Sequence, residues 1–265
     1  MRFLIPTFFT TLGALAAPAW EGELSSLKVG PHPAISASSL DFQLSWKGML
    51  NAGKLNLEFA PPTSKKTGSF VIKSTASSQG PASALFPYKH NYWSEIHPAT
   101  LRSRYFHSSE NDSREITVTR NRYSLAKVTS QEITTDSKTK LTAAQLRSFS
   151  HGRAQDIFSA ILYIRSQKLN PGDEHTLLLF PFKSPYLLKV RTEAKEKHFG
   201  RDSIRLSFSM RKIDRDTLDL VPYKKLKKPV TLWLSDDADR IPLELRASVY
   251  IGDVRAILTR FTKNP

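Results

Sequence analysis

Apolar and polar residues alternate with a period of two along most of the chain after residue 39. This alternation predicts strands with one buried and one solvated face, because successive side chains of a strand point to opposite sides. Leu40, Phe42 and Leu44 share one face of the first such segment, and "KGMLNAG" joins it to a second, as in a hairpin. The predicted strand segments are 40–46, 55–59, 70–74, 101–109, 114–128 (two strands joined near 119–122), 175–182, 185–195, 203–213, 229–235, 240–251 and 253–261.

One segment departs from the strand pattern. Ile157, Ile161 and Ile164 are spaced as on one face of a helix, which Gln155 or Asp156 can begin. The apolar face is broad, so we predict a buried helix over about 154–168 that plugs or crosses the sheet. About ten strands, one helix and no repeated strand–helix–strand unit predict a mainly β fold, in which an antiparallel curved sheet forms a sandwich or an open barrel.

The alternation weakens between Ser77 and Pro98, where aromatic residues stand among prolines. We expect an ordered loop or an irregular sheet edge in this region. No internal repeat and no linker interrupt the rest of the chain. Residues 40–265 are therefore predicted to form a single β domain, preceded by an irregular segment over 20–39.

The first 19 residues have the composition of a secretory signal peptide. Arg2 precedes an apolar run, and Ala17-Pro18-Ala19 supplies small residues of the kind that signal peptidase recognises, so we expect cleavage after Ala19. The alternative is a short buried helix. The chain has no cysteine, so we expect neither disulfides nor a lipoprotein, and no later segment has the roughly 20 apolar residues of a membrane span. The expected product is periplasmic or secreted.

A formal net charge of +15 narrows the expected partners. Nucleic acid does not suit an exported protein, and no segment interleaves aromatic with basic residues as base-stacking modules do. We expect instead an anionic lipid, lipopolysaccharide or an acidic glycan, although the charge can also serve solubility alone. The densest basic segment contains Lys224, Lys225, Lys227 and Lys228, which form either a solvated strand connection or a contact for an anionic surface.

The densest acidic cluster, Asp236, Asp237 and Asp239, lies between two predicted strands. A calcium loop would also need a glycine and a distal glutamate, but no glycine follows the aspartates and Ile241-Pro242 restarts a strand. A glycosidase pair would need a second carboxylate across a cleft, for which Asp156 and Glu174 are the candidates. A tight turn, whose carboxylates accept N–H bonds and pair with arginine, fits the pattern best.

Arg165 ends a mostly apolar helix, where an unpaired guanidinium would be costly to bury. We predict that Arg165 reaches the Asp236/Asp237 turn or Asp156 and so locks the helix to the sheet. The candidates for structural ion pairs are therefore Asp156, Arg165, Asp236, Asp237 and Arg240.

No catalytic, metal or cofactor site is predicted. His90, His97 and His107 have spacings that match no standard zinc arrangement. The serines include no Gly-x-Ser-x-Gly elbow.

Three segments resemble landmarks of a bacterial exported family known as domain of unknown function 3108. The first is the opening hairpin, "DFQLSWKGMLNAGKLNLEF", and the others are the helix and the closing strands. The helix landmark comprises Asp156, Ser159, Tyr163, Arg165, Pro171 and Gly172, and the closing landmark comprises Trp233, Asp236, Asp237, Arg240, Pro242 and Gly252. The resemblance covers roughly residues 40–262, most weakly at 77–150. It implies a mostly antiparallel β fold in the bacterial envelope and implies no reaction.

These observations favour a non-catalytic envelope protein that binds a lipid or glycan or assists envelope assembly. Two alternatives stay open: a hydrolase that cleaves envelope polysaccharide with converging carboxylates, and a structural partner of an outer-membrane or secretion complex. A cleft with convergent carboxylates and aromatic walls would favour the hydrolase, whereas an apolar lumen would favour the lipid-binding protein. An exposed apolar patch would favour the structural partner.

Overall fold

A computed structural model describes residues 17–32, 36–46, 50–60, 68–224, 226, 228–249 and 252–263. Most of the predicted signal segment, residues 1–16, lies outside this part of the chain. The helices are the 3-10 helix η1 (Ala19–Glu23), α1 (Gly80–Leu85) and α2 (Ile157–Ser166). The strands are β1 (Ser38–Trp46), β2 (Leu50–Ala60), β3 (Phe70–Ser78), β4 (Lys89–Ile96), β5 (Ser103–Asn111), β6 (Glu115–Tyr123), β7 (Val128–Asp136), β8 (Thr142–Phe149), β9 (Glu174–Leu179), β10 (Tyr186–His198), β11 (Arg201–Ile213), β12 (Leu220–Pro222), β13 (Val230–Ser235), β14 (Pro242–Val249) and β15 (Gly252–Lys263).

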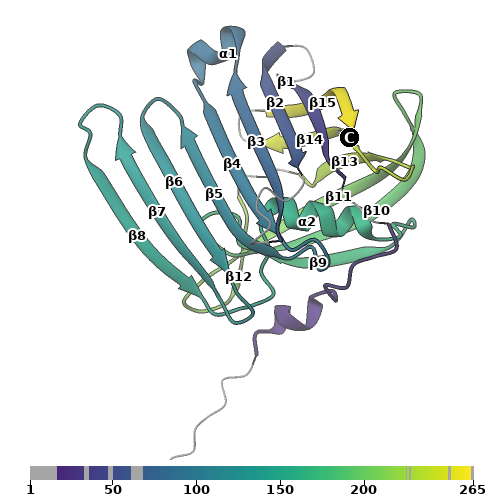
Figure 1. Cartoon of the computed structure of the whole chain (residues 1–265), viewed down its shortest axis with the longest axis horizontal. Coiled ribbons are helices and arrows are strands. Elements are labelled where there is room, and N and C mark those ends of the chain that lie inside the picture. Colours follow the sequence, from purple (N-terminus) through teal and green to yellow (C-terminus); the bar gives the residue numbers. More distant parts are fainter. Residues whose placement is uncertain are drawn as a thin grey trace, which may run out of the picture.

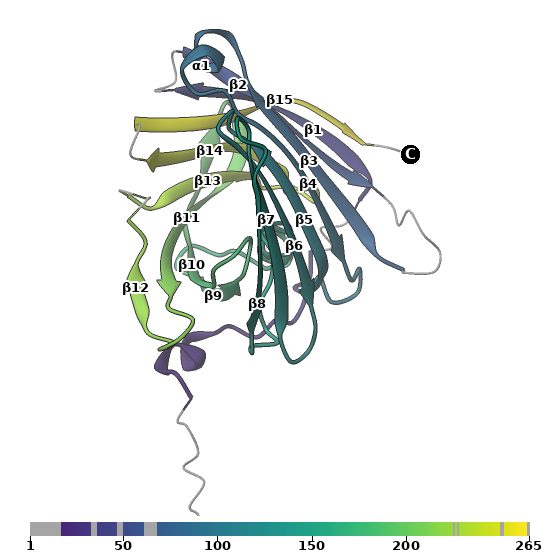
Figure 2. The same cartoon turned by 90° about the vertical axis from the view of Figure 1, so that its left-hand side faces the viewer.

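The strands form one antiparallel sheet in the order β8-β7-β6-β5-β4-β3-β2-β1-β15-β14-β13-β11-β10-β9, and β12 pairs with β11. The pairing of β1 with β15 joins two limbs, an N-terminal limb of β1–β8 and a C-terminal limb of β9–β15. Figures 1 and 2 show that the sheet curls so that the limbs face one another, with α2 between them. The predicted mainly β fold, with an open curved antiparallel sheet and a buried helix, is confirmed.

Helix α2 packs inside the curve and contacts both β4 and β9. One side of the helix, with Phe158 and Leu162, joins the large core of the N-terminal limb and of β13–β15. The other side, with Ala160 and Ile164, joins a second core on the C-terminal limb. Because the helix buries residues on both sides, it fills the space that the two limbs enclose.

The sheet is not closed, since β8 and β9 are its two ends and do not pair. Side chains bridge this gap instead. Asn121 Nδ2 and the Tyr123 hydroxyl, both on β6, donate to the main-chain oxygen of Phe180 at 3.2 and 2.6 Å. Trp20 of η1 is buried against Phe149 and Phe180 and donates to the Leu218 main-chain oxygen at 2.8 Å. The segment before the first strand therefore helps to close the molecule.

Two local predictions are wrong. The region from 77 to 98 contains α1 and the regular strand β4 rather than an irregular loop. Tyr92 and Ile96 are buried as in an ordinary strand, but between them Ser94 is fully buried while Trp93 is 38% exposed on the outer face, which disguises the alternation.

The turn expected near 119–122 lies inside β6, and the chain turns at 124–127 instead. Polar Thr119 and Asn121 face the core from this strand and hide its alternation. The Ser124 hydroxyl stabilises the true turn by accepting a hydrogen bond from the Lys127 N–H at 3.0 Å.

Candidate functional site

Asp156 begins α2 and is fully buried. Its Oδ1 atom accepts hydrogen bonds from the main-chain N–H groups of Phe158 and Ser159, both at 2.8 Å, and Oδ2 accepts one from the Ser94 hydroxyl at 2.6 Å. Burial raises the pKa of Asp156, and these hydrogen bonds oppose the rise. The predicted start of the helix is confirmed. In the described part of the chain, the partners of this carboxylate are N–H and hydroxyl groups rather than an arginine.

Arg240 lies in the turn between β13 and β14 and binds the other end of α2. Its guanidinium donates to the main-chain oxygens of Arg165 at 3.4 Å, of Lys168 at 3.1 Å and of Gln167. The last carbonyl groups of a helix carry partial negative charge and lack partners within the helix. Burial lowers the pKa of Arg240, which is 4% exposed, and the nearby carboxylates of the turn oppose this change.

Arg165 donates in the opposite direction, from the helix to the turn. Its Nη2 atom lies 2.7 Å from the main-chain oxygen of Asp239, and its guanidinium carbon lies 5.4 Å from the centre of the Phe59 ring. Burial lowers the pKa of Arg165 to about 10. Each arginine thus donates to the main chain of the segment that carries the other. The structure brings Arg165 to the aspartate turn through a carbonyl oxygen rather than through a carboxylate.

The aspartate turn is organised by Asp237. Its Oδ1 atom accepts hydrogen bonds from the Ser235 hydroxyl at 2.7 Å and from the N–H groups of Asp239 and Arg240 at 3.0 Å. Burial alone would raise the pKa of Asp237, but these hydrogen bonds outweigh it and hold the pKa below its usual value.

The neighbouring carboxylates of the turn make ion pairs. Asp236 lies 3.0 Å from Lys195 Nζ, and Asp239 lies 2.8 Å from Lys263 Nζ. Within the described ranges, no group of three or more His, Asp and Glu side chains is arranged to hold a metal ion.

An apolar cavity of about 200 Å³ lies between α2 and the C-terminal limb. Its lining comes from α2, from the inward faces of β9–β11, β13 and β14, and from the segment before β13. The lining residues are Ile157, Ala160, Ile161, Ile164, Arg165, Leu179, Leu188, Phe208, Met210, Leu226, Val230, Leu232, Leu234 and Leu245. Arg165 is the one charged residue among them. The isoleucines that predicted the helix therefore line a cavity, which the sequence pattern did not indicate.

The cavity lining extends to the lysine-rich segment, because Leu226 of that segment is one of the lining residues. Lys224 and Lys228, on either side of Leu226, are exposed. Lys225 and Lys227 lie outside the described residues. Part of the predicted anionic-surface segment therefore lies beside the cavity.

A polar cluster on the inner face of the N-terminal limb was also not predicted. The hydroxyls of Tyr88 and Tyr92 donate to Glu110 Oε1 at 2.6 and 2.5 Å. The His90 ring stacks on Tyr92 at 4.0 Å, and its Nε2 atom lies 3.1 Å from Ser74 Oγ. Burial lowers the pKa of His90 to about 4, so the ring is neutral near neutral pH. These residues come from β3, β4, β5 and the position just before β4, and the strand register brings them together.

The family model described as "Protein of unknown function (DUF3108)" matches residues 41–259. The chain belongs to this family. The DUF3108 match spans the opening hairpin, α2 and nearly all of the closing strands, and so confirms the resemblance of those segments. No protein with a curated description matches the chain.

Solved structures add a likeness of fold. A β-barrel-like protein of domain of unknown function DUF1849 from Brucella abortus is 9% identical, with a TM-score of 0.56, and the match covers 89% of this DUF3108 chain and all of the other. At 9% identity, this similarity shows only that the two proteins have a similar fold.

Two further structures are less similar, each with a TM-score of 0.33. One is a candidate exported protein with a YmcC-like fold from Bacteroides fragilis, 9% identical, covering 89% of this chain and 100% of that chain. The other is a candidate lipoprotein from Parabacteroides distasonis, 7% identical, covering 89% of this chain and 99% of that chain. In the described part of this DUF3108 protein, no helix has the length and apolar character to cross a membrane.

Proposed function

We propose that this protein is an exported, non-catalytic envelope protein that binds the hydrocarbon chain of an anionic lipid in the cavity beside α2. The proposal rests on the cavity, whose lining residues are all apolar except Arg165. The signal-like N-terminal sequence and the net charge of +15 support export and an anionic ligand.

The size of the cavity suits part of a hydrocarbon chain. An engineered apolar cavity of about 150 Å³ stays dry and binds benzene. The cavity of about 200 Å³ beside α2 can therefore hold a short length of hydrocarbon, and the rest of the chain would follow the apolar wall toward Leu226. Burying apolar surface contributes about 0.8 kcal/mol per methylene group, which favours a ligand with a long alkyl chain.

Positive charge beside the cavity would select the headgroup. Lys224 and Lys228 are exposed on either side of Leu226, and neither makes an ion pair with a described residue. A carboxylate or phosphate attached to the buried chain would lie within reach of these ammonium groups. Such a contact is exposed, so it should add about 1 kcal/mol or less and weaken with salt.

The proposal is tested with cis-parinaric acid, a fluorescent fatty acid, and with its uncharged methyl ester. The wild-type protein should bind both saturably and should prefer the acid at low salt. Met210→Trp would fill the cavity from β11 and should weaken binding of both probes at least tenfold. Ser209→Trp places the same ring on the opposite face of β11 and should leave the affinity unchanged.

The headgroup is tested separately with Lys224→Gln/Lys228→Gln. This variant should lose the preference for the acid and keep its affinity for the ester. A matched variant, Lys127→Gln/Lys138→Gln, removes two exposed lysines far from the cavity lining and should behave like the wild type. Equal binding by the two tryptophan variants, or a failure of the wild type to saturate, would contradict the proposed lipid site.

A further inference from the structure

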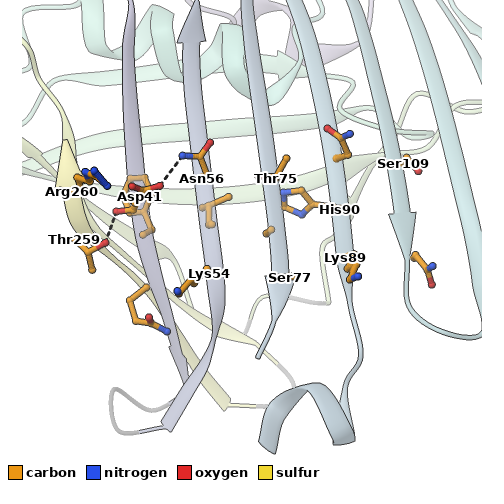
Figure 3. A pocket seen from close by; sticks show the side chains of 16 residues that line it. Asp41, Lys54, Asn56, Thr75, Ser77, Lys89, His90, Ser109, Thr259 and Arg260 are labelled. Carbon is orange, nitrogen blue, oxygen red and sulfur yellow. Dashed lines mark hydrogen bonds between the residues drawn. The ribbon is translucent and has the colours of Figure 1, made fainter. Parts of the chain in front are cut away.

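The outer face of the N-terminal limb carries a polar groove, which we define by two rows of side chains across β1–β5. Strand register aligns the rows: Asp41, Asn56, Thr75, Asn91 and Ser109 form the first, and Gln43, Lys54, Ser77, Lys89 and Asn111 form the second. Together with Thr259 and Arg260 of β15, these residues line a hollow of about 780 Å³ (Figure 3). Pockets that hold small molecules usually measure about 300–1,000 Å³.

The rows face away from the core. Phe42, Ile72 and Tyr92 alternate with members of the rows along their strands and are buried on the inner side. The groove and the apolar cavity beside α2 therefore lie on opposite faces of the sheet, and most of the groove belongs to the N-terminal limb. A ligand in one does not contact the lining of the other.

Positive charge in the groove is not neutralised within it. Among its lining residues Asp41 is the one carboxylate, and it accepts a hydrogen bond from Asn56 Nδ2 at 2.7 Å. Lys54, Lys89 and Arg260 make no hydrogen bond or ion pair with a side chain that the structure describes. Lys54 and Lys89 flank Ser77 in the second row, two strands and about 10 Å apart at the backbone. Their long stems can therefore reach one anionic group from both sides.

Polar neighbours at fixed spacing surround these cations. Thr75, Asn91 and Ser109 present two hydroxyls and one amide on three adjacent strands, as Figure 3 shows for Thr75 and Ser109. These groups both donate and accept hydrogen bonds, as the hydroxyls of a sugar do. Phe42 and His90 also belong to the lining, but Phe42 is buried in the core and the His90 ring stacks on Tyr92 at the inner face. The two rows themselves contain no aromatic residue, which does not suit nucleobases because these bind by stacking on aromatic rings.

We propose that this polar groove binds a saccharide that carries a phosphate or carboxylate group. Lys54 and Lys89 bind the anionic group over Ser77, and Arg260, opposite Asp41 on β15, adds positive charge at the other side of the groove. Thr75, Asn91 and Ser109 hydrogen-bond the ring hydroxyls. The site would give the protein a contact with acidic envelope polysaccharide that is separate from its lipid.

Affinity electrophoresis of the full chain tests the proposal with phosphomannan and with the same mannan after removal of its phosphate. The wild type should bind phosphomannan at least tenfold more tightly than the dephosphorylated polymer. Lys54→Gln/Lys89→Gln should lose most of this difference. Lys127→Gln/Lys138→Gln lowers the net charge equally outside the groove and should stay within about twofold of the wild type.

The contribution of the sugar is tested by Thr75→Val, which keeps the shape of the side chain and suits a strand. This variant should bind phosphomannan about threefold more weakly, in line with the loss of one hydrogen bond, and should bind inorganic phosphate as the wild type does. Unchanged phosphomannan affinity in Thr75→Val would overturn the saccharide assignment. Equal losses in the two lysine variants would overturn the groove as a site, since binding would then follow net charge alone. Circular dichroism of each variant confirms that the fold is intact.

Discussion

The two ends of α2 are both fixed by buried charged side chains, but those charges find their partners in different ways. At the first turn, the carboxylate of Asp156 accepts hydrogen bonds from N–H groups of the helix and from a hydroxyl of β4. At the last turn, the guanidinium groups of Arg165 and Arg240 donate to main-chain oxygens. Each charge is opposite in sign to the partial charge of the helix end that it meets. A helix buried between two sheet limbs is thus held by groups that complete backbone hydrogen bonds, and among the described residues these groups form no direct ion pair.

The two ends of α2 differ in how far along the chain the hydrogen-bond partners lie from one another. Asp156 caps residues two and three positions later, so this end is local. Arg240 reaches back more than 70 positions to the carbonyl groups of 165, 167 and 168, so the other end exists only in the folded protein. We expect the local end to tolerate a neutral substitute of the same shape and the distant end to show coupling between its two arginines.

Replacing Asp156 should produce the largest effect. Asp156→Ala removes the helix cap and leaves buried N–H and hydroxyl groups without acceptors, which should lower the free energy of unfolding by about 3 kcal/mol. Asp156→Asn keeps the acceptor that caps the helix, and its amide can donate to Ser94, so it should lose about 1 kcal/mol. Urea unfolding measures both values. Equal losses would show that the charge, and not the cap geometry, holds this end.

Replacing Arg240 with methionine should lower the free energy of unfolding by about 2 kcal/mol, because buried carbonyls at the helix end lose their donors. Arg165→Met removes one hydrogen bond and the contact with Phe59, and should lose slightly less. In the double variant the loss should exceed the sum of the two single losses by about 1 kcal/mol, since each single variant also relieves the repulsion between the two guanidinium groups and this relief is gained only once. Strictly additive losses, measured by a double-mutant cycle in urea, would show that the two arginines act independently.

The aspartate turn should respond more weakly. Asp237→Ala removes the acceptor of four hydrogen bonds, three of them on Oδ1, and should lower the free energy of unfolding by about 1.5 kcal/mol, whereas Asp237→Asn keeps Oδ1 and should lose about 0.5 kcal/mol. Asp236→Asn removes only the partly exposed pair with Lys195, so a change below about 0.5 kcal/mol is expected. A thermal-shift series with all three variants tests this order, and a larger effect at Asp236 than at Asp237→Ala would reverse our view of the turn.

The smallest effect is a pH dependence that originates at Asp156. Burial raises its pKa in the folded protein above the ordinary value of 3.8, so between these two values the folded state binds more protons than the unfolded chain. The contribution of Asp156 to stability therefore decreases as pH rises through this window and is greatest at its acid end. The free energy of unfolding of the wild type, minus that of Asp156→Asn, should increase as pH is lowered. A flat difference would mean that the folded carboxyl titrates normally.

The local chemistry of α2 could be predicted from the sequence. The spacing of Ile157, Ile161 and Ile164 and the carboxylate at Asp156 were sufficient for the helix and its start. Strand β11 was equally clear, because Ile204 and Leu206 alternate with Arg205 and Ser207. Strand β4 was missed, since a buried serine and an exposed tryptophan reverse the expected order.

Neither candidate binding site could be predicted, because both depend on strand register. The polar groove takes two side chains from each of six strands, and a shift of one residue in any pairing would turn its members toward the core. The cavity depends on how far the C-terminal limb stands from α2, which follows from side-chain volumes on both. Nothing in the sequence around Thr75 or Asn91 indicates that their side chains are neighbours.

The pairing of β1 with β15 has a consequence for how the chain folds. The limb of β1–β8 is a series of neighbouring strands that can pair in the order in which they are made. Strand β1, however, meets its second neighbour only when the last strand arrives, after more than 200 residues. Until then β1 presents an open edge in the middle of the future sheet, where strands of other molecules can add. A chain shortened before β15 should therefore form intermolecular sheets, and a slow final folding step is expected of the intact one.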